Sequence, residues 1–134
     1  VAGGLLGYGG ASALGQRLIG TGVTAFGNGS AYIGVGDDST AAAATQTDLV
    51  AATNKHREAM DATYPLHTDG TGSSSNATIT YKSTFETGDA NFTWSEWGIF
   101  NASSSGRMLN RKVFSGGTKT SAEAWSLTIS LTLA

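Results

Sequence analysis

The stretch Trp125-Ser-Leu-Thr-Ile-Ser-Leu-Thr-Leu133 carries the clearest structural pattern in the sequence. Its odd-numbered positions are all apolar, and its even-numbered positions are all Ser or Thr. Because successive side chains of a strand point to opposite faces of the sheet, this alternation predicts a strand with one buried and one solvated face. One-sided burial is typical of antiparallel sheets. This stretch therefore indicates an antiparallel β fold.

Other segments extend the pattern. Ile79, Tyr81 and Phe85 alternate with Thr and Lys, and a turn at residues 101–106 predicts a hairpin. The fold class is therefore predicted as mainly β, an antiparallel β-sandwich or barrel (β-tulip-like) of roughly six to eight strands. Besides the stretch quoted above, we expect strands at residues 31–35, 54–61, 78–86 and 107–114.

The aromatic residues before the hairpin turn change phase. Phe92 and Trp94 are predicted to point to one side, and Trp97 and Ile99 to the other. We also expect a bulge or bend near residues 95–96, between these two pairs. Aromatic residues at strand spacing usually pack in a core, so we predict that Trp94, Trp97 and Phe100 are core residues and not a platform for a sugar or a base.

Two segments lack the strand pattern. Thr40–Leu49 is rich in Ala and is compatible with a short helical turn. Thr63–Asn76 contains Pro65, two glycines and a run of serines, which together predict a loop.

Residues 1–22 are predicted to form an N-terminal arm or short helix, ahead of a single β-rich domain at residues 23–134. A helix is expected from about Ala11 to Ile19, with Gly20 as the residue that ends it. A mobile tail and an arm that orders against a neighbouring subunit both fit the high glycine content. We favour an inter-subunit arm, because a solvated tail has little use for large apolar residues. The predicted contacts are Leu5, Leu6, Tyr8, Leu14 and Leu18.

Composition excludes several classes of partner. Charged residues make up 13% of the chain and the net charge is −2, so we expect no nucleic-acid partner, which would need clustered Lys and Arg. No apolar run approaches the ~20 residues of a membrane span, and we expect neither a signal peptide nor a membrane partner. The absence of Cys excludes disulfides and thiolate metal sites.

Residues that could carry chemistry do not form a recognised set. The acidic pair at residues 37–38 lacks the further oxygen ligands of a calcium loop and fits a turn. His56 with Glu58, and His67 with Asp69, lack a third ligand and a zinc-protease spacing, so we expect two solvent-exposed histidines. No Ser lies in a nucleophile elbow. We therefore predict no enzyme activity, no catalytic residues, no metal and no cofactor.

An ordered series of short motifs runs from Tyr32 onwards. It comprises Tyr32-Ile-Gly-Val-Gly36, Thr40-Ala-Ala-Ala-Ala-Thr-Gln-Thr-Asp-Leu49, Glu96-Trp-Gly-Ile-Phe-Asn-Ala102, Gly106-Arg-Met-Leu-Asn-Arg111 and the strand that begins with Trp125. Their order and spacing resemble those of a widespread family of small tailed-bacteriophage virion proteins, variously labelled head decoration (cement) or tail-fibre proteins. The family pattern commonly has an acid and then an Arg after the second motif. Arg57 fits the Arg, whereas residues 50–54 contain no acid.

The resemblance implies a structural protein made in the host cytoplasm and located on the outer capsid surface of the virion. Related decoration proteins are often homotrimers with extended segments that reach across capsomers. The expected function is therefore capsid decoration that stabilises the icosahedral head. The expected partners are the major capsid protein and copies of the chain itself. The alternative is a tail-fibre or tail-tip module that contacts the host through the loop Thr63–Asn76.

Several residues of these motifs have predicted structural roles. Glu96 and Arg111 are expected to form an ion pair across the hairpin, which helps to set strand register. Gly98 permits close approach next to Trp97. A tight turn into the Thr/Ala segment would use the two glycines of the first motif. The predicted scaffold residues are Gly34, Gly36, Glu96, Trp97, Gly98 and Arg111.

Overall fold

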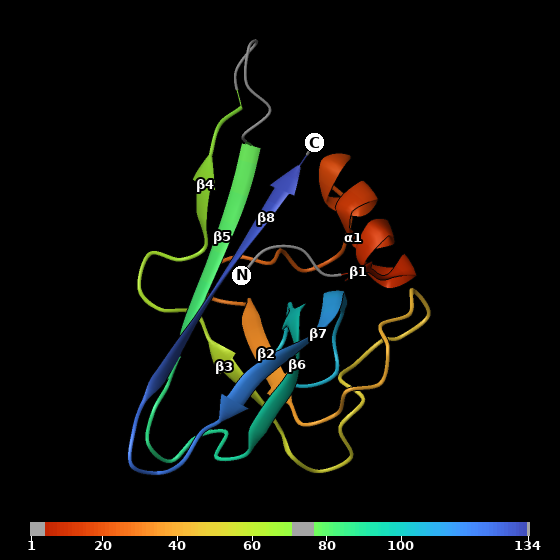
Figure 1. The fold of residues 1–134 in the computed structure, drawn as a ribbon. Helices are drawn as coiled ribbons and strands as arrows, with labels where there is room; N and C mark the ends of the chain where they lie inside the picture. The colour runs from red at the N-terminus through yellow and green to blue at the C-terminus, as the bar shows by residue number, and fades with distance from the viewer. Residues whose placement is uncertain (1–4, 71–76, 134) are drawn as a thin grey trace.

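The computed structural model describes residues 5–70 and 77–133, and these form two antiparallel sheets that face each other (Figure 1). The larger sheet has five strands in the order β1-β7-β6-β2-β3, and the smaller has three in the order β4-β5-β8. The predicted mainly β, antiparallel sandwich is confirmed, and the sheets do not close into a barrel. The elements are β1 (Leu5–Leu6), α1 (Tyr8–Leu18), β2 (Tyr32–Gly36), β3 (Lys55–Ala59), β4 (Leu66–Thr68), β5 (Ala77–Phe85), β6 (Thr93–Phe100), β7 (Met108–Thr118) and β8 (Trp125–Leu133).

The core lies between the two sheets. Inner-facing residues of β2, β6 and β7 pack against those of β5 and β8, as the alternation of residues 78–86 and 125–133 predicts. Edge-to-face aromatic contacts cross this core: the ring centroid of Trp94 lies 4.8 Å from that of Phe85 and 5.1 Å from that of Trp125. Because each buried aromatic side chain contributes about 1.5–3 kcal/mol, these rings hold the sheets together.

The bulge predicted near residues 95–96 is present, but its consequence differs from the prediction. Pairing between β6 and β7 shifts register between Trp94 and Glu96. The alternation breaks at this irregularity, so Trp94 and Trp97 join one core cluster instead of pointing to opposite sides. Phe100 is also fully buried, which confirms that these aromatic residues are core.

A long connection covers the outer face of the five-stranded sheet. Residues 37–54 join β2 to β3, and Leu49 packs against Phe100 and Met108. The helical turn suggested for Thr40–Leu49 is wrong, since the segment is irregular apart from a turn at residues 44–45. In a helix these carbonyls would accept hydrogen bonds from backbone N–H groups. Here side chains bind them instead: Arg111 donates to the carbonyl of Thr40, and Gln46 donates to that of Ala41.

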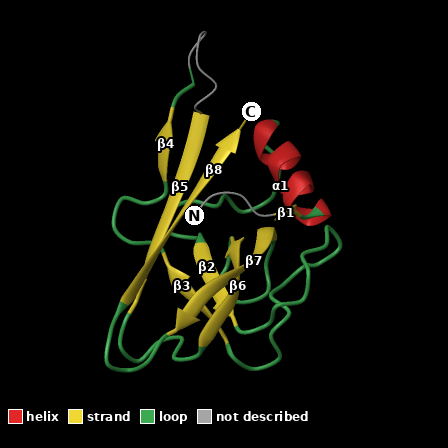
Figure 2. Ribbon diagram, in the orientation of Figure 1, coloured by secondary structure: helices red, strands yellow, loops and turns green. Residues whose placement is uncertain are grey.

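Helix α1 begins at Tyr8, earlier than predicted, and lies beside the end of the sheet where β1 and β7 pair (Figure 2). Gly20 ends it as predicted, with a φ of +77°. The N–H groups of Gly20 and Thr21 donate to the carbonyls of Arg17 and Gln16, which is the Schellman pattern of helix termination. No helix within the described residues is long and apolar enough to cross a membrane.

The loop prediction for Thr63–Asn76 is partly wrong. Leu66–Thr68 forms β4 and pairs with β5 from Thr78 to Thr80. The edge of β5 offers unpaired backbone groups, and a three-residue strand is enough to bond to them. Residues 71–76 of this prediction lie outside the described residues.

Candidate interaction surface

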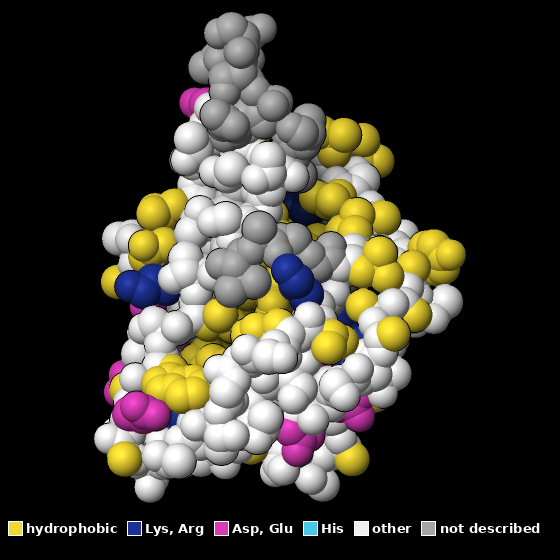
Figure 3. Space-filling model, in the orientation of Figure 1, with side chains coloured by type: hydrophobic (Ala, Val, Ile, Leu, Met, Phe, Trp, Pro, Cys, Tyr) yellow, Lys and Arg dark blue, Asp and Glu magenta, His cyan; other side chains and the backbone are white. Residues whose placement is uncertain are grey.

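Large apolar side chains are exposed on β1, on α1 and just after it. The exposed fraction is 87% for Leu18, 75% for Ile19 and 69% for Tyr8. Figure 3 shows hydrophobic side chains gathered over α1. Every interface residue proposed from the sequence lies in this group, which we call the apolar surface: Leu5, Leu6, Tyr8, Leu14, Leu18 and Ile19.

The apolar surface faces outward because α1 turns its small residues toward the sheet. Gly10 and Ala13 are the buried residues of the helix. A Cβ placed on Gly10 would lie 1.9 Å from the carbonyl oxygen of Leu109, so the helix backbone touches the backbone of β7. With the small residues inside, Leu14 and Leu18 are left on the solvent side, one helical turn apart. An ordinary surface helix has the opposite arrangement.

Hydrogen bonds hold the apolar surface in place. Leu5 and Leu6 pair with Arg111 and Asn110 of β7, which adds β1 to the edge of the sheet. The N–H of Tyr8 donates to the carbonyl of Ala44 at 2.9 Å. The guanidinium of Arg107 donates to the carbonyl of Gly9 at 2.8 Å. These bonds fix exposed apolar residues on a rigid support, which lowers the entropic cost of contact with a partner.

A hollow of about 230 Å³ lies beside the helix. Its walls come from α1, from the connection after it, and from β5 and β7, and they include Leu14, Phe26, Tyr81 and Leu109. Burial raises the pKa of Tyr81 to about 12. The lining is largely apolar, so the hollow continues the character of the neighbouring apolar surface.

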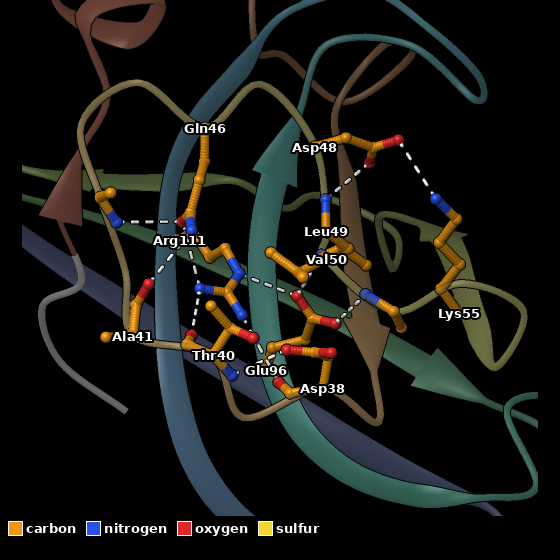
Figure 4. Close-up of polar contacts among 12 residues, drawn as sticks. Asp38, Thr40, Ala41, Gln46, Asp48, Leu49, Val50, Lys55, Glu96 and Arg111 are labelled. Carbon is orange, nitrogen blue, oxygen red and sulfur yellow. Dashed lines mark hydrogen bonds and ion pairs between the residues drawn. The ribbon is translucent and has the colours of Figure 1, made fainter.

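Glu96 and Arg111 form the predicted ion pair, and both side chains are buried on the outer side of the sheet (Figure 4). The Nε of Arg111 lies 2.8 Å from Oε1 of Glu96. The Glu96 carboxylate also accepts from the N–H groups of Val50 and Ala51, each at 2.8 Å. The pair therefore does more than set hairpin register, because it fastens the 37–54 connection to β6 and β7.

The other end of the guanidinium holds the start of the same connection. Arg111 donates to the carbonyl of Thr40 at 2.8 Å and to the side-chain oxygen of Gln46 at 3.1 Å. Hydrogen bonds from Thr40 hold the pKa of Asp38 below its usual value, with a smaller contribution from Arg111. The connection is thus shaped by side chains, in the absence of regular structure.

The first-motif glycines have a different role from the predicted one. Gly34 and Gly36 lie within β2, and neither has a positive φ. A Cβ on Gly34 would lie 2.7 Å from the Phe100 ring, and one on Gly36 would lie 2.5 Å from the Glu96 carboxylate. Both glycines make room for side chains of β6. Gly98 allows close approach as expected, since its Cβ would lie 3.0 Å from the Asn110 carbonyl oxygen.

Arg57 anchors the turn between β6 and β7, a role that sequence reasoning missed. It donates to the carbonyls of Ala102 and Ser105, each at 2.9 Å. Its guanidinium also lies 3.6 Å from the centre of the Phe100 ring. The sequence feature that could have indicated this role is an Arg on a strand that pairs with β2. The Arg lies opposite Gly34, which leaves room for a planar guanidinium across the sheet.

The two histidines lie in different surroundings. His67 is exposed, as predicted, with Nδ1 3.2 Å from Asp69. His56 is half-buried: its Nε2 lies 2.9 Å from Glu58, and its ring packs against Phe85. The expectation that His56 and Glu58 have no third ligand nearby is wrong, because the connection after β5 brings Asp89 beside them.

Among the described residues, the apolar surface is thus the feature that best fits contact with another molecule. No family model matches the chain, and no curated protein or solved structure is detectably similar to it.

Proposed function

We propose that this chain is a structural protein of a tailed-bacteriophage virion that binds the outside of the icosahedral head as a decoration protein. The exposed apolar surface on β1 and α1 carries this proposal. The order of the five sequence motifs from Tyr32 to the final strand is its second support. In this proposal the partners are the major capsid protein and further copies of the chain.

The apolar surface suits a protein that works in contact with other subunits. Leu14 and Leu18 on the supported helix, and Ile19 just after it, would be buried by a neighbouring subunit. Burial of apolar area contributes about 25 cal/mol per Å², so the few side chains of one apolar surface give only a weak contact by themselves. Many copies around a symmetric shell make such weak contacts effective.

Stabilisation of the head follows by mass action. A protein that binds the assembled, expanded shell and not its free subunits lowers the free energy of the assembled state. The chain needs no turnover for this task. The non-enzymatic character remains a prediction, and loss of any turnover on changing His56 or Asp37 would contradict it.

The first test is the copy number in purified virions, measured by quantitative mass spectrometry against the major capsid protein. A ratio near one to one is expected for a decoration protein. A few copies per particle would overturn the head assignment and favour the tail.

The second test measures binding to empty expanded heads. We expect Leu18→Ser combined with Ile19→Ser to weaken head binding, since both side chains belong to the apolar surface. Leu66→Ser is the matched control, because Leu66 is an exposed leucine on β4, in the other sheet. Equal binding by both variants would contradict a role for the apolar surface.

A tail-fibre or tail-tip module is the second candidate. It is favoured by one observation, the edge strand β4, which pairs with β5 (Figure 1) and whose three residues are all exposed. In that case Leu66→Ser would reduce attachment to host cells, and the variant at residues 18 and 19 would not.

A further inference from the structure

Three ligand-type side chains meet at the edge of the five-stranded sheet opposite to β1. His56 and Glu58 lie two residues apart on β3 and therefore share one face of the strand. Their partners across β2 are Val35 and Ile33, which are core residues, so this face is the inner one. Asp89 reaches the same place from the connection between β5 and β6.

The ligand atoms are close enough to share one ion. One atom from each of His56, Glu58 and Asp89 lies within 4.8 Å of the other two. The His56 Nε2 and a Glu58 carboxylate oxygen are only 2.9 Å apart. A metal at about 2.1 Å from each atom needs pairwise separations of roughly 4 Å or less. Side-chain movements of under about 1 Å would bring a separation of 4.8 Å within this limit.

The charges around these residues favour a bound cation. Glu58 and Asp89 are two carboxylates in one cluster, and like charges so close together repel each other. Among the described residues, no Lys or Arg pairs with Asp89, and the ion-pair partner of Glu58 is His56. The buried Lys119 donates instead to the carbonyl of Glu86 and to the side chain of Asn91.

We propose that His56, Glu58 and Asp89 form a binding site for a divalent transition metal, with Zn²⁺ as the preferred ion. One imidazole and two carboxylates are ligands that Zn²⁺ accepts, and water fills the remaining position. Ca²⁺ needs six to eight oxygen ligands, roughly twice what these residues offer, and is disfavoured. The side chains of His56 and Glu58 are 35% and 26% exposed, so an ion can enter from solvent.

Metal binding would join parts of the chain that the sheets alone leave separate. His56 and Glu58 belong to the edge strand of the larger sheet, whereas Asp89 follows the central strand of the smaller one. The existing link between these parts includes a hydrogen bond from the Ser83 hydroxyl to the carbonyl of Glu58 at 3.2 Å. An ion here would add a further tie across the open edge of the sandwich and stabilise the folded state by mass action.

The test is isothermal titration of the tag-free chain with Zn²⁺, together with Co²⁺ absorption as a spectroscopic probe of ligation. Asp89→Asn and His56→Gln each remove one ligand and keep the side-chain size. His67→Gln is the matched control, since His67 also pairs with an Asp but has no third ligand in the described residues. Circular dichroism of the metal-free variants verifies that each one folds.

We expect one Zn²⁺ per chain, a raised melting temperature, and no response to Ca²⁺ or Mg²⁺. Asp89→Asn and His56→Gln should each weaken Zn²⁺ binding by at least about tenfold, while His67→Gln leaves it unchanged. The proposal is overturned if the unsubstituted chain takes up no Zn²⁺, or if binding survives Asp89→Asn and is lost in His67→Gln.

Discussion

Glu96 is the residue on which the outer face of the larger sheet depends most. Its carboxylate accepts from Arg111, Val50 and Ala51 and is fully buried. We expect Glu96→Ala to lower the free energy of unfolding by about 3–5 kcal/mol, because Arg111 is left as an unpaired buried charge. Urea denaturation followed by tryptophan fluorescence measures this loss.

The control for this prediction is the exposed pair of Lys55 and Asp48, whose charged atoms are 3.4 Å apart. Lys55→Ala should cost less than about 1 kcal/mol, since exposed ion pairs contribute little. In the double variant Glu96→Ala with Arg111→Ala, the loss should be smaller than the sum of the two single losses, by about 1–3 kcal/mol. Additive losses would show that the two side chains act independently.

Tyr81 gives the stability a definite dependence on alkaline pH. Its pKa is raised by burial to about 12, whereas an unfolded tyrosine ionises near pH ~10. Above pH ~10 the unfolded chain loses this proton while the folded chain keeps it, so the contribution of Tyr81 is intact below that pH and lost as the pH rises through about 12. The full loss amounts to about 2–3 kcal/mol.

Urea denaturation across the alkaline range tests this dependence. Tyr81→Phe should be less sensitive to pH than the unsubstituted chain over this range, because Phe has no proton to lose. Tyr8→Phe is the control, since the Tyr8 ring is exposed on α1, and it should keep the pH dependence of the unsubstituted chain. If the Tyr81→Phe curve has the same slope, burial of this hydroxyl does not govern the alkaline loss.

Among the elements, α1 offers a test of why a helix forms in so glycine-rich a segment. Gly10 touches the backbone of β7, whereas a Cβ on Gly15 would meet nothing within 4 Å. Gly10→Ala should destabilise the chain by about 1–3 kcal/mol because the helix must move away from the sheet. Gly15→Ala should stabilise it by about 0.5–1 kcal/mol through helix propensity. Melting temperatures that shift in the same direction for both variants would contradict this account of the packing.

The strands could be predicted from the sequence because alternation is a local property. Residues 125–133 pair with residues 77–85, close to the predicted 78–86, and Tyr81, Phe85 and Ile129 lie inside as expected. The irregularity between β6 and β7 could also be located, but the facing of Trp94 and Trp97 could not, since a break in the alternation reverses every later position. The start of α1 was missed because Gly9 and Gly10 have poor helix propensity, and contact with β7 overrides it.

The candidate sites could likewise be predicted only in part. The five interface residues could be proposed because large apolar residues in a glycine-rich segment are conspicuous, and all five are exposed. The pairing of Glu96 with Arg111 was also expected, although the two backbone N–H groups that complete it come from Val50 and Ala51 in an irregular connection. Asp89 could not be placed beside His56, because that proximity depends on how the two sheets pack.

For the whole molecule, the apolar surface predicts self-association. We expect the mass measured by light scattering after gel filtration to rise with concentration toward that of a trimer, the state that the family resemblance implies. Leu18→Glu with Ile19→Glu should keep the chain monomeric, because charges on the apolar surface oppose its burial.

The melting temperature of the diluted monomer should barely change, since both side chains are already 75% or more exposed. Leu66→Glu, on β4, is the control and should associate like the unsubstituted chain. If the double variant still associates, the contact lies elsewhere, and the open edge of the nine-residue strand β8 becomes the place to look.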